Sequence, residues 1–183
     1  MRKRRILEYD LIASGIPSKL MLCKKDSLDH RLRGLLDKAF HALASGKHVL
    51  LVEEAGAARD MLCVVLAKRL MACCEAASEV MLSLFQSALM DTFAGHTFNE
   101  SMEASEDWNR FTNAKYLLLG GMDGENVARK LYKSSISGLV QDRIVHNVPT
   151  FIATGLTAED ILSFYGSDVS RAVDGYFEYV SSY

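Results

Sequence analysis

Residues 48–70, HVLLVEEAGAARDMLCVVLAKRL, decide the fold class of this 183-residue chain. A short apolar run, Val49–Val52, comes first, and a turn separates it from a stretch after Arg59 that is apolar nearly all round. A continuous apolar strand followed by a buried helix is typical of a parallel sheet covered on both faces. The turn between them stands where many such sheets carry a phosphate-binding loop with the pattern G-x-x-x-x-G-K-[ST].

This turn lacks most of the residues with which such a loop binds phosphate. The loop positions carry Glu53, Ala58, Arg59 and Asp60, and only Gly56, an intervening glycine in many such loops, is retained. Glu53 puts a side chain where the backbone must curl around phosphate. Its charge would repel a nucleotide by about 4 kcal/mol at ~4 Å and an effective dielectric of ~20. Arg59 keeps the charge of the usual Lys without its compact ammonium group, and Asp60 adds a negative charge beside the phosphates.

Strands and helices alternate along the rest of the chain. Helices are expected over 2–14, 28–43, 59–70, 86–93, 127–143, 157–164 and 168–174, and strands over 49–52, 80–85, 115–119, 148–154 and 176–180. Ser27 and Thr157 are candidate N-caps, and Gly46 is a candidate C-terminal cap. The alternation predicts a three-layer α/β domain built on a parallel sheet of about five strands. The working surface of such a sheet lies at the carboxyl ends of its strands, here in the turns after the first, third and fourth strands.

Five segments follow one another in an order found in a known family. They are LIASGIPSKL (11–20), HVLLVEEAGAARDML (48–62), NAKYLLLGGMDGE (113–125), QDRIVHNVPTFIATGLTAEDIL (141–162) and FYGSDVSRAVDG (164–175). Together they resemble an AAA+ P-loop ATPase of the DnaC/IstB group, which contains replicative helicase loaders and transposition helper ATPases. The resemblance implies a basic helix and "GIP" turn over 1–20, followed by a degenerate AAA+ ATPase domain over 21–183.

The same resemblance implies that ATP turnover has been lost. Gly120 and Gly121 stand where the family has two carboxylates, and Gly155 stands where it has a polar sensor. Asp123 and Glu125 are nearby, but a displacement by two residues at a strand end moves a side chain about 6–7 Å. Without the Lys, both acids and the sensor, little remains of what a phosphoryl-transfer site provides. We therefore expect a pseudo-ATPase with no catalytic residue and no cofactor; ATP and magnesium would bind only if the degenerate loop still holds them.

Two arginines near the C-terminus have a candidate role each. The family's terminal arginine falls on Arg171, which could act as an arginine finger in a neighbouring subunit's site. The plainer interpretation is an exposed ion pair with Asp168 or Asp174. Arg143 has the same two interpretations, and a structural ion pair is the expectation there too. No set of His, Cys or carboxylate residues has the spacing of metal ligands, so no metal site is expected.

The charge of the chain offers little for nucleic acid to bind. A net charge of −2 gives no reason to expect tight nonspecific DNA binding. The exception is the run Arg2, Lys3, Arg4 and Arg5, a candidate set of nucleic-acid contacts. The sequence has neither an apolar signal segment nor a stretch that could span a membrane, so the expected location is the cytoplasm.

The function expected from these observations is that of a non-catalytic interaction module in DNA replication, of phage, plasmid or other mobile-element origin. It would resemble a helicase loader without ATP binding or hydrolysis, and its partner would be a replicative helicase, an active AAA+ loader or itself. The GIP turn begins fifteen residues in, so no separate helicase-binding region is expected before it. Aromatic residues near the C-terminus could form a partner surface, although alternate burial of rings along the last strand is the plainer expectation. These residues are Phe164, Tyr165, Tyr176, Phe177, Tyr179 and Tyr183.

Two alternatives belong to other classes of protein. An atypical ATPase would use Arg59 and Asp60, with Asp123 or Glu125 as the acid. A DNA-binding accessory protein would combine Arg2–Arg5 with further cations, namely Lys19, Lys24 and Lys25.

The pairing of Arg59 bears on the choice between these functions. If the loop holds no nucleotide, the guanidinium of Arg59 should pair with a carboxylate, because a desolvated charge needs a partner. The carboxylates in reach are expected to be Glu53, Glu54 and Asp123.

Overall fold

The computed structural model describes residues 8–54, 56–84, 109–123 and 130–181. The strands are β1 (His48–Val52), β2 (Val80–Ser83), β3 (Tyr116–Leu119), β4 (Thr150–Thr154) and β5 (Phe177–Ser181). They form one parallel sheet in the order β2-β3-β4-β1-β5. The expected parallel sheet of about five strands is therefore confirmed.

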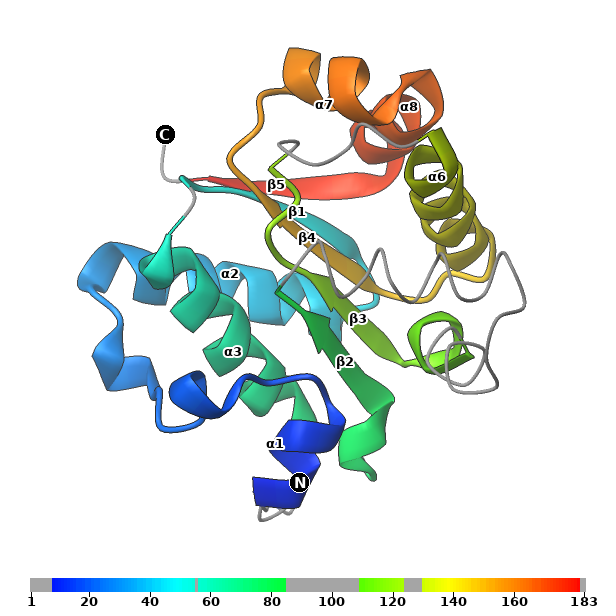
Figure 1. Cartoon of the computed structure of the whole chain (residues 1–183). Helices are drawn as coiled ribbons and strands as arrows, with labels where there is room; N and C mark the ends of the chain where they lie inside the picture. Colours follow the sequence, from blue (N-terminus) through cyan, green and yellow to red (C-terminus); the bar gives the residue numbers. More distant parts are fainter. Residues whose placement is uncertain (1–7, 55, 85–108, 124–129, 182–183) are drawn as a thin grey trace.

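Helices cover both faces of this sheet (Figure 1). One layer contains α1 (Glu8–Ala13), η1 (Ser18–Leu20), η2 (Lys25–Ser27), α2 (His30–Ala44), α3 (Ala57–Met71) and η3 (Ala77–Glu79). The other contains α6 (Lys130–Val145), α7 (Ala158–Tyr165) and α8 (Ser167–Tyr176). Successive strand residues point to opposite faces, so Val49 and Leu51 join the core beneath α2 and α3, whereas Leu50 joins the core beneath α6, α7 and α8. The three-layer α/β architecture is confirmed.

Two of the three helix caps predicted from the sequence are confirmed. Thr157 caps α7, since its hydroxyl accepts the N–H of Asp160 at 3.2 Å. Gly46 follows the end of α2, and the next N–H, of Lys47, donates back to Ala42 O at 3.0 Å. Ser27 was the wrong N-cap for α2: it belongs to η2, and Asp29 caps the helix by accepting the N–H of Leu32 at 2.8 Å.

Several expected elements are shorter than predicted or lie outside the described residues. The first helix is described only over Glu8–Ala13, and Arg2, Lys3, Arg4 and Arg5 lie outside the description, as do the expected helix over 86–93, Glu125 and Tyr183. The last strand does not bury alternate rings as expected. Phe177 is buried, but Tyr179, two residues on, is 47% exposed because β5 is the edge of the sheet.

Arg143 of α6 differs most from expectation. Its side chain is 1% exposed, and its partners in the described part of the chain are neutral oxygens instead of a carboxylate. Nε donates to Thr150 Oγ1 at 2.8 Å, and Nη2 to Pro149 O at 2.8 Å. Nη1 donates to the carbonyls of three residues at 2.9–3.2 Å, namely Phe111, Thr112 and Ala114. The guanidinium therefore ties together the segments that lead into β3 and β4, and its burial lowers the pKa of Arg143 to about 10.

Substitution of Arg143 should therefore destabilise the fold. Arg143→Met removes the donors of several buried carbonyls, each costing ~1–3 kcal/mol when unsatisfied, and we expect a loss of about 3 kcal/mol in the free energy of unfolding. Urea unfolding measures this loss. The control is Arg171→Met on α8, an exposed arginine whose loss should change the free energy of unfolding by less than ~0.5 kcal/mol. Equal effects of the two substitutions would contradict the role assigned to Arg143.

Candidate functional site at the carboxyl ends of the strands

Three turns meet at the carboxyl edge of the sheet, as the strand order requires. The turn after β1 is held to β4 by the N–H of Glu53, which donates to Thr154 O at 2.9 Å. The turn after β3 is held to β4 twice: Thr154 Oγ1 donates to Met122 O at 2.6 Å, and the N–H of Met122 donates to Ala153 O at 3.3 Å. The residues that the sequence singled out in these turns are therefore brought together.

Glu53, in the position of the first loop glycine, turns toward α2. Its carboxylate is almost fully buried and makes a two-pronged ion pair with Arg31, with Nη1–Oε2 at 2.8 Å and Nη2–Oε1 at 2.7 Å. Arg31 was not foreseen, because it lies on α2, 22 residues before Glu53. The pair fastens the start of the degenerate loop to α2.

Arg59, in the position of the loop lysine, pairs with Asp123 after β3. Nη1 donates to Oδ1 at 2.6 Å, and Nη2 contacts Oδ2, so the pair is two-pronged. The Arg59 side chain is only 3% exposed. Asp123 is one of the three carboxylates expected to pair with it, so that expectation is confirmed.

The carboxylate of Asp123 also receives a backbone donor. The N–H of Gly155, the residue in the sensor position, donates to Asp123 Oδ1 at 2.8 Å. Burial alone would raise the pKa of Asp123, but the hydrogen bonds from Arg59 and Gly155 outweigh burial and lower it. The same pair raises the pKa of Arg59 although desolvation opposes this. Both shifts indicate that the charged forms are the stable ones in this site.

The remaining loop residues add no neutralising group. Gly56 is the N-cap of α3 and offers no side-chain acceptor, and Ala58 is exposed. Asp60 is partly buried, and burial raises its pKa in spite of nearby Arg59 and Lys19. Within the described residues, no group of three His, Cys, Asp or Glu side chains could hold a metal ion.

Gly120 and Gly121, in the positions of the two expected acids, are confined by the end of β2. The N–H of Gly120 donates to Ser83 O at 2.7 Å, and a Cβ at this position would lie 2.8 Å from Leu84 Cδ2. Gly121 has a φ of +69°, and a Cβ there would lie 2.7 Å from Leu84 O. A side chain at Gly121 would therefore collide with the backbone of Leu84, whereas one at Gly120 would require only the Leu84 side chain to shift.

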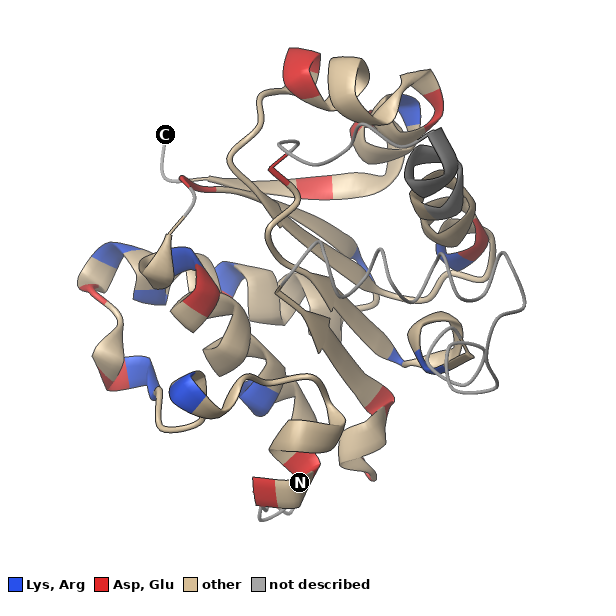
Figure 2. Ribbon diagram, in the orientation of Figure 1, with Lys and Arg blue, Asp and Glu red and all other residues tan. Residues whose placement is uncertain are grey.

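The other candidate residues lie away from this edge. Arg171 is exposed on α8 and pairs with Asp168 at 2.9 Å, the plainer of its two expected roles. Lys24 is exposed, whereas Lys25 pairs with Asp37 at 2.9 Å, which weakens its candidacy as a DNA contact. Figure 2 shows basic residues around η1, η2 and α2 interspersed with acidic ones. None of the described helices is long and apolar enough to cross a lipid bilayer.

Solved structures share the fold of this chain, whereas no protein-family model and no curated protein sequence matches it. The DnaI structure superposes with a TM-score of 0.71 at 14% identity, over 91% of this chain and 94% of that one. The structure of the DnaC helicase loader gives a TM-score of 0.69 at 15% identity, over 90% and 99% of the two chains. A candidate primosome component from Streptococcus pyogenes serotype M3 gives 0.60 at 17% identity, over 96% of each chain. Identities this low establish likeness of fold alone.

Restoring an acid after β3 should cost stability. Gly121→Asp forces a side chain into a backbone conformation that suits glycine and against Leu84 O, so we expect a loss of about 2–4 kcal/mol in the free energy of unfolding. Thermal and urea unfolding report the loss. Gly34→Asp on α2 is the matched control, because a Cβ at Gly34 meets nothing within 4 Å. A Gly121→Asp protein as stable as the control would show that the turn is not confined.

The Arg59–Asp123 pair should make stability depend on acid pH. Because the folded-state pKa of Asp123 is lower than its ordinary value of 3.8, its contribution is complete near neutral pH and is lost as pH falls through the folded pKa. We expect Asp123→Asn to be less stable than wild type at pH 7, and the difference to shrink as the pH falls below 3.8 and through the lowered folded-state pKa. Denaturant unfolding from pH 7 to pH 2.5 measures it. A difference independent of pH would mean that the carboxylate charge is not what stabilises the site.

Proposed function

From the fold that this chain shares with the DnaI and DnaC structures, we propose that it is a non-catalytic AAA+-like interaction module in DNA replication. It resembles a helicase loader that has lost ATP binding and hydrolysis, and it acts by binding a partner protein. The observation that carries this proposal is the ion pair between Arg59 and Asp123.

This pair removes the positive charge on which nucleotide binding would depend. A phosphate could reach Arg59 only by displacing Asp123, and breaking a buried ion pair costs about 3–5 kcal/mol. The displaced carboxylate would then stand beside the phosphate with its negative charge. The atypical-ATPase alternative needs Arg59 for the nucleotide and Asp123 or Glu125 as the acid. Arg59 and Asp123 neutralise each other, and Glu125 lies outside the described residues.

Hydrolysis lacks support for a separate reason. A magnesium-dependent phosphoryl transfer needs carboxylates that hold the metal and position water. The turn after β3 offers Gly120 and Gly121 at these positions, and at Gly121 the Leu84 carbonyl lies too close for a larger residue. Glu53 is engaged by Arg31.

The role in replication rests on the likeness of fold, and the partner is proposed from the same likeness. One of the similar structures is a DnaC helicase loader. A replicative helicase, an active AAA+ loader or a second copy of this chain is therefore the proposed partner. Exposed apolar side chains near the edge strand support a contact surface there, since Tyr176 is 64% exposed and Tyr179 47%. No cofactor is proposed, and the cytoplasm is the proposed location.

Calorimetric titration with ATP and ADP, with and without magnesium, tests the loss of nucleotide binding. We expect no heat of binding for the wild type up to about 1 mM nucleotide, which limits any affinity to weaker than roughly −4 kcal/mol. Asp123→Asn frees Arg59 from its counter-ion and should bind nucleotide more tightly than wild type does. Asp168→Asn, which removes the acid of an exposed pair, is the control and should behave as wild type. Micromolar binding by the wild type would overturn the proposal.

A further inference from the structure

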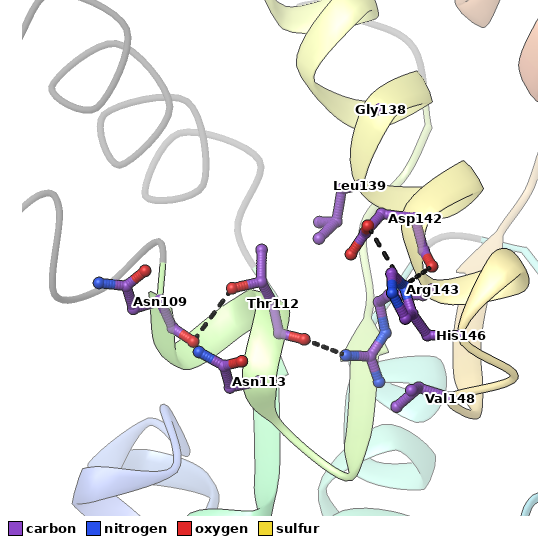
Figure 3. A pocket seen from close by; sticks show the side chains of 9 residues that line it. All are labelled: Asn109, Thr112, Asn113, Gly138, Leu139, Asp142, Arg143, His146 and Val148. Carbon is purple, nitrogen blue, oxygen red and sulfur yellow. Dashed lines mark hydrogen bonds and ion pairs between the residues drawn. The ribbon is translucent and has the colours of Figure 1, made fainter.

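A polar cavity lies at the opposite edge of the sheet from the Arg59 site, near the amino ends of β3 and β4. It has a volume of about 640 Å³ and opens between residues 109–113 and the C-terminal half of α6 (Figure 3). Ligand pockets commonly have volumes of ~300–1,000 Å³. Because β3 and β4 run from this edge toward the carboxyl edge, the cavity is separate from the Arg59 site.

The two walls of the cavity carry polar groups. Gly138 and Asp142 of α6 and His146, one residue after its end, follow one another at intervals of four residues and form one wall. Asn109 and Asn113, both exposed, lie on the opposite wall (Figure 3), where the amide of Asn109 points away from α6. The amide of Asn113 has no hydrogen-bond partner among the described residues and can therefore donate to a ligand.

Arg143 brings a buried positive charge to this cavity: within the described residues its hydrogen-bond partners are all neutral, and the carboxylate that acts on it, Asp142, is not hydrogen-bonded to it. Of its five N–H donors, four are accounted for by its neutral oxygen acceptors: one on Nε, two on Nη1 and one on Nη2. One Nη2 hydrogen has no acceptor among the described residues. A buried charge is screened less than an exposed one, so its field extends into the cavity.

The negative charge in the cavity lies farther out. Asp142 is half-exposed and faces His146, with 3.3 Å between its Oδ1 and the ring Nδ1. Its carboxylate is screened by solvent, and it would repel an anion only at the rim. The interior of the cavity thus favours an anion, and its rim favours a neutral or positive group.

We propose that this cavity binds the oxyanion, phosphate or carboxylate, of a small polar ligand. The oxyanion lies toward Arg143 and accepts a hydrogen bond from the amide of Asn113. The remainder of the ligand lies against Asp142 and His146. This site is independent of the proposed loss of ATP binding, because it shares no residue with the Arg59 site.

Gly138 allows a test that preserves the fold. A Cβ at Gly138 meets nothing within 4 Å, and Gly138 lines the cavity, so Gly138→Leu directs its side chain toward the cavity from a Cβ that makes no clash. Gly34→Leu on α2 is the matched control, since Gly34 is also exposed within a helix and its Cβ would meet nothing within 4 Å. Replacing glycine within a helix should raise the melting temperature of both variants by about 2–4 °C.

The probes are inorganic phosphate and acetate, each compared with chloride at equal ionic strength in thermal unfolding. At ten times the dissociation constant, a bound anion should raise the melting temperature of wild type and Gly34→Leu by about 3–6 °C. Gly138→Leu should show only the general salt effect, which is common to all three proteins. A shift with phosphate alone or with acetate alone identifies which oxyanion the site takes.

Two outcomes would overturn the proposal. The first is that none of the three proteins shows a rise in melting temperature beyond that in chloride at up to ~50 mM phosphate or acetate. The second is an equal shift in Gly138→Leu and Gly34→Leu, which would mean that the anion binds elsewhere. Asn113→Leu provides a second check, because loss of its amide should weaken anion binding at least about tenfold, equivalent to ~1.4 kcal/mol.

Discussion

A buried guanidinium must be neutralised or fully hydrogen-bonded, and this requirement shapes the carboxyl edge of the sheet. Arg59 enters the site from α3, and Asp123 meets it from the turn after β3. The same carboxylate accepts the N–H of Gly155 after β4. One side chain thus joins three segments that are distant in the sequence, and the site has the charge balance that a bound phosphate would otherwise provide.

The amino edge meets the same requirement by different means. Arg143 is as well buried as Arg59, but its acceptors are backbone carbonyls and a hydroxyl instead of a carboxylate. Neutral acceptors satisfy the N–H groups and leave the charge in place. The two edges therefore differ in electrostatics: at the carboxyl edge a carboxylate pairs directly with Arg59, and at the amino edge the described hydrogen-bond partners of Arg143 are all neutral, with Asp142 acting on it only through its charge.

Local sequence signals predicted the framework well. The apolar run Val49–Val52 forms a central strand, and Thr157 and Gly46 mark helix ends, because each of these features depends on nearby residues. The choice of Ser27 over Asp29 as the N-cap was wrong because both residue types cap helices and they lie two positions apart. The sequence limited the expected partner of Arg59 to three carboxylates. That the partner is Asp123 depends on the packing of β3 beside β4, which the sequence does not give.

Long-range partners were beyond what the sequence could indicate. Arg31 reaches Glu53 because α2 packs against β1, and the spacing of residues in the sequence does not reveal this packing. The acceptors of Arg143 are carbonyls, which every residue has, so residue types could not identify them. The cavity beside α6 depends on the separation between residues 109–113 and α6. The presence of Gly138 in the sequence does not by itself predict a cavity.

The contact between the glycine turn and Leu84 limits the evolutionary routes open to this chain. An acid at position 121 is compatible with the fold only after the end of β2 has moved away, since the obstacle is the Leu84 carbonyl itself. Any lineage acquiring an acid here must first change a neighbouring segment, at no benefit until the acid arrives. Such order-dependent epistasis keeps a carboxylate out of this turn even where it would be advantageous.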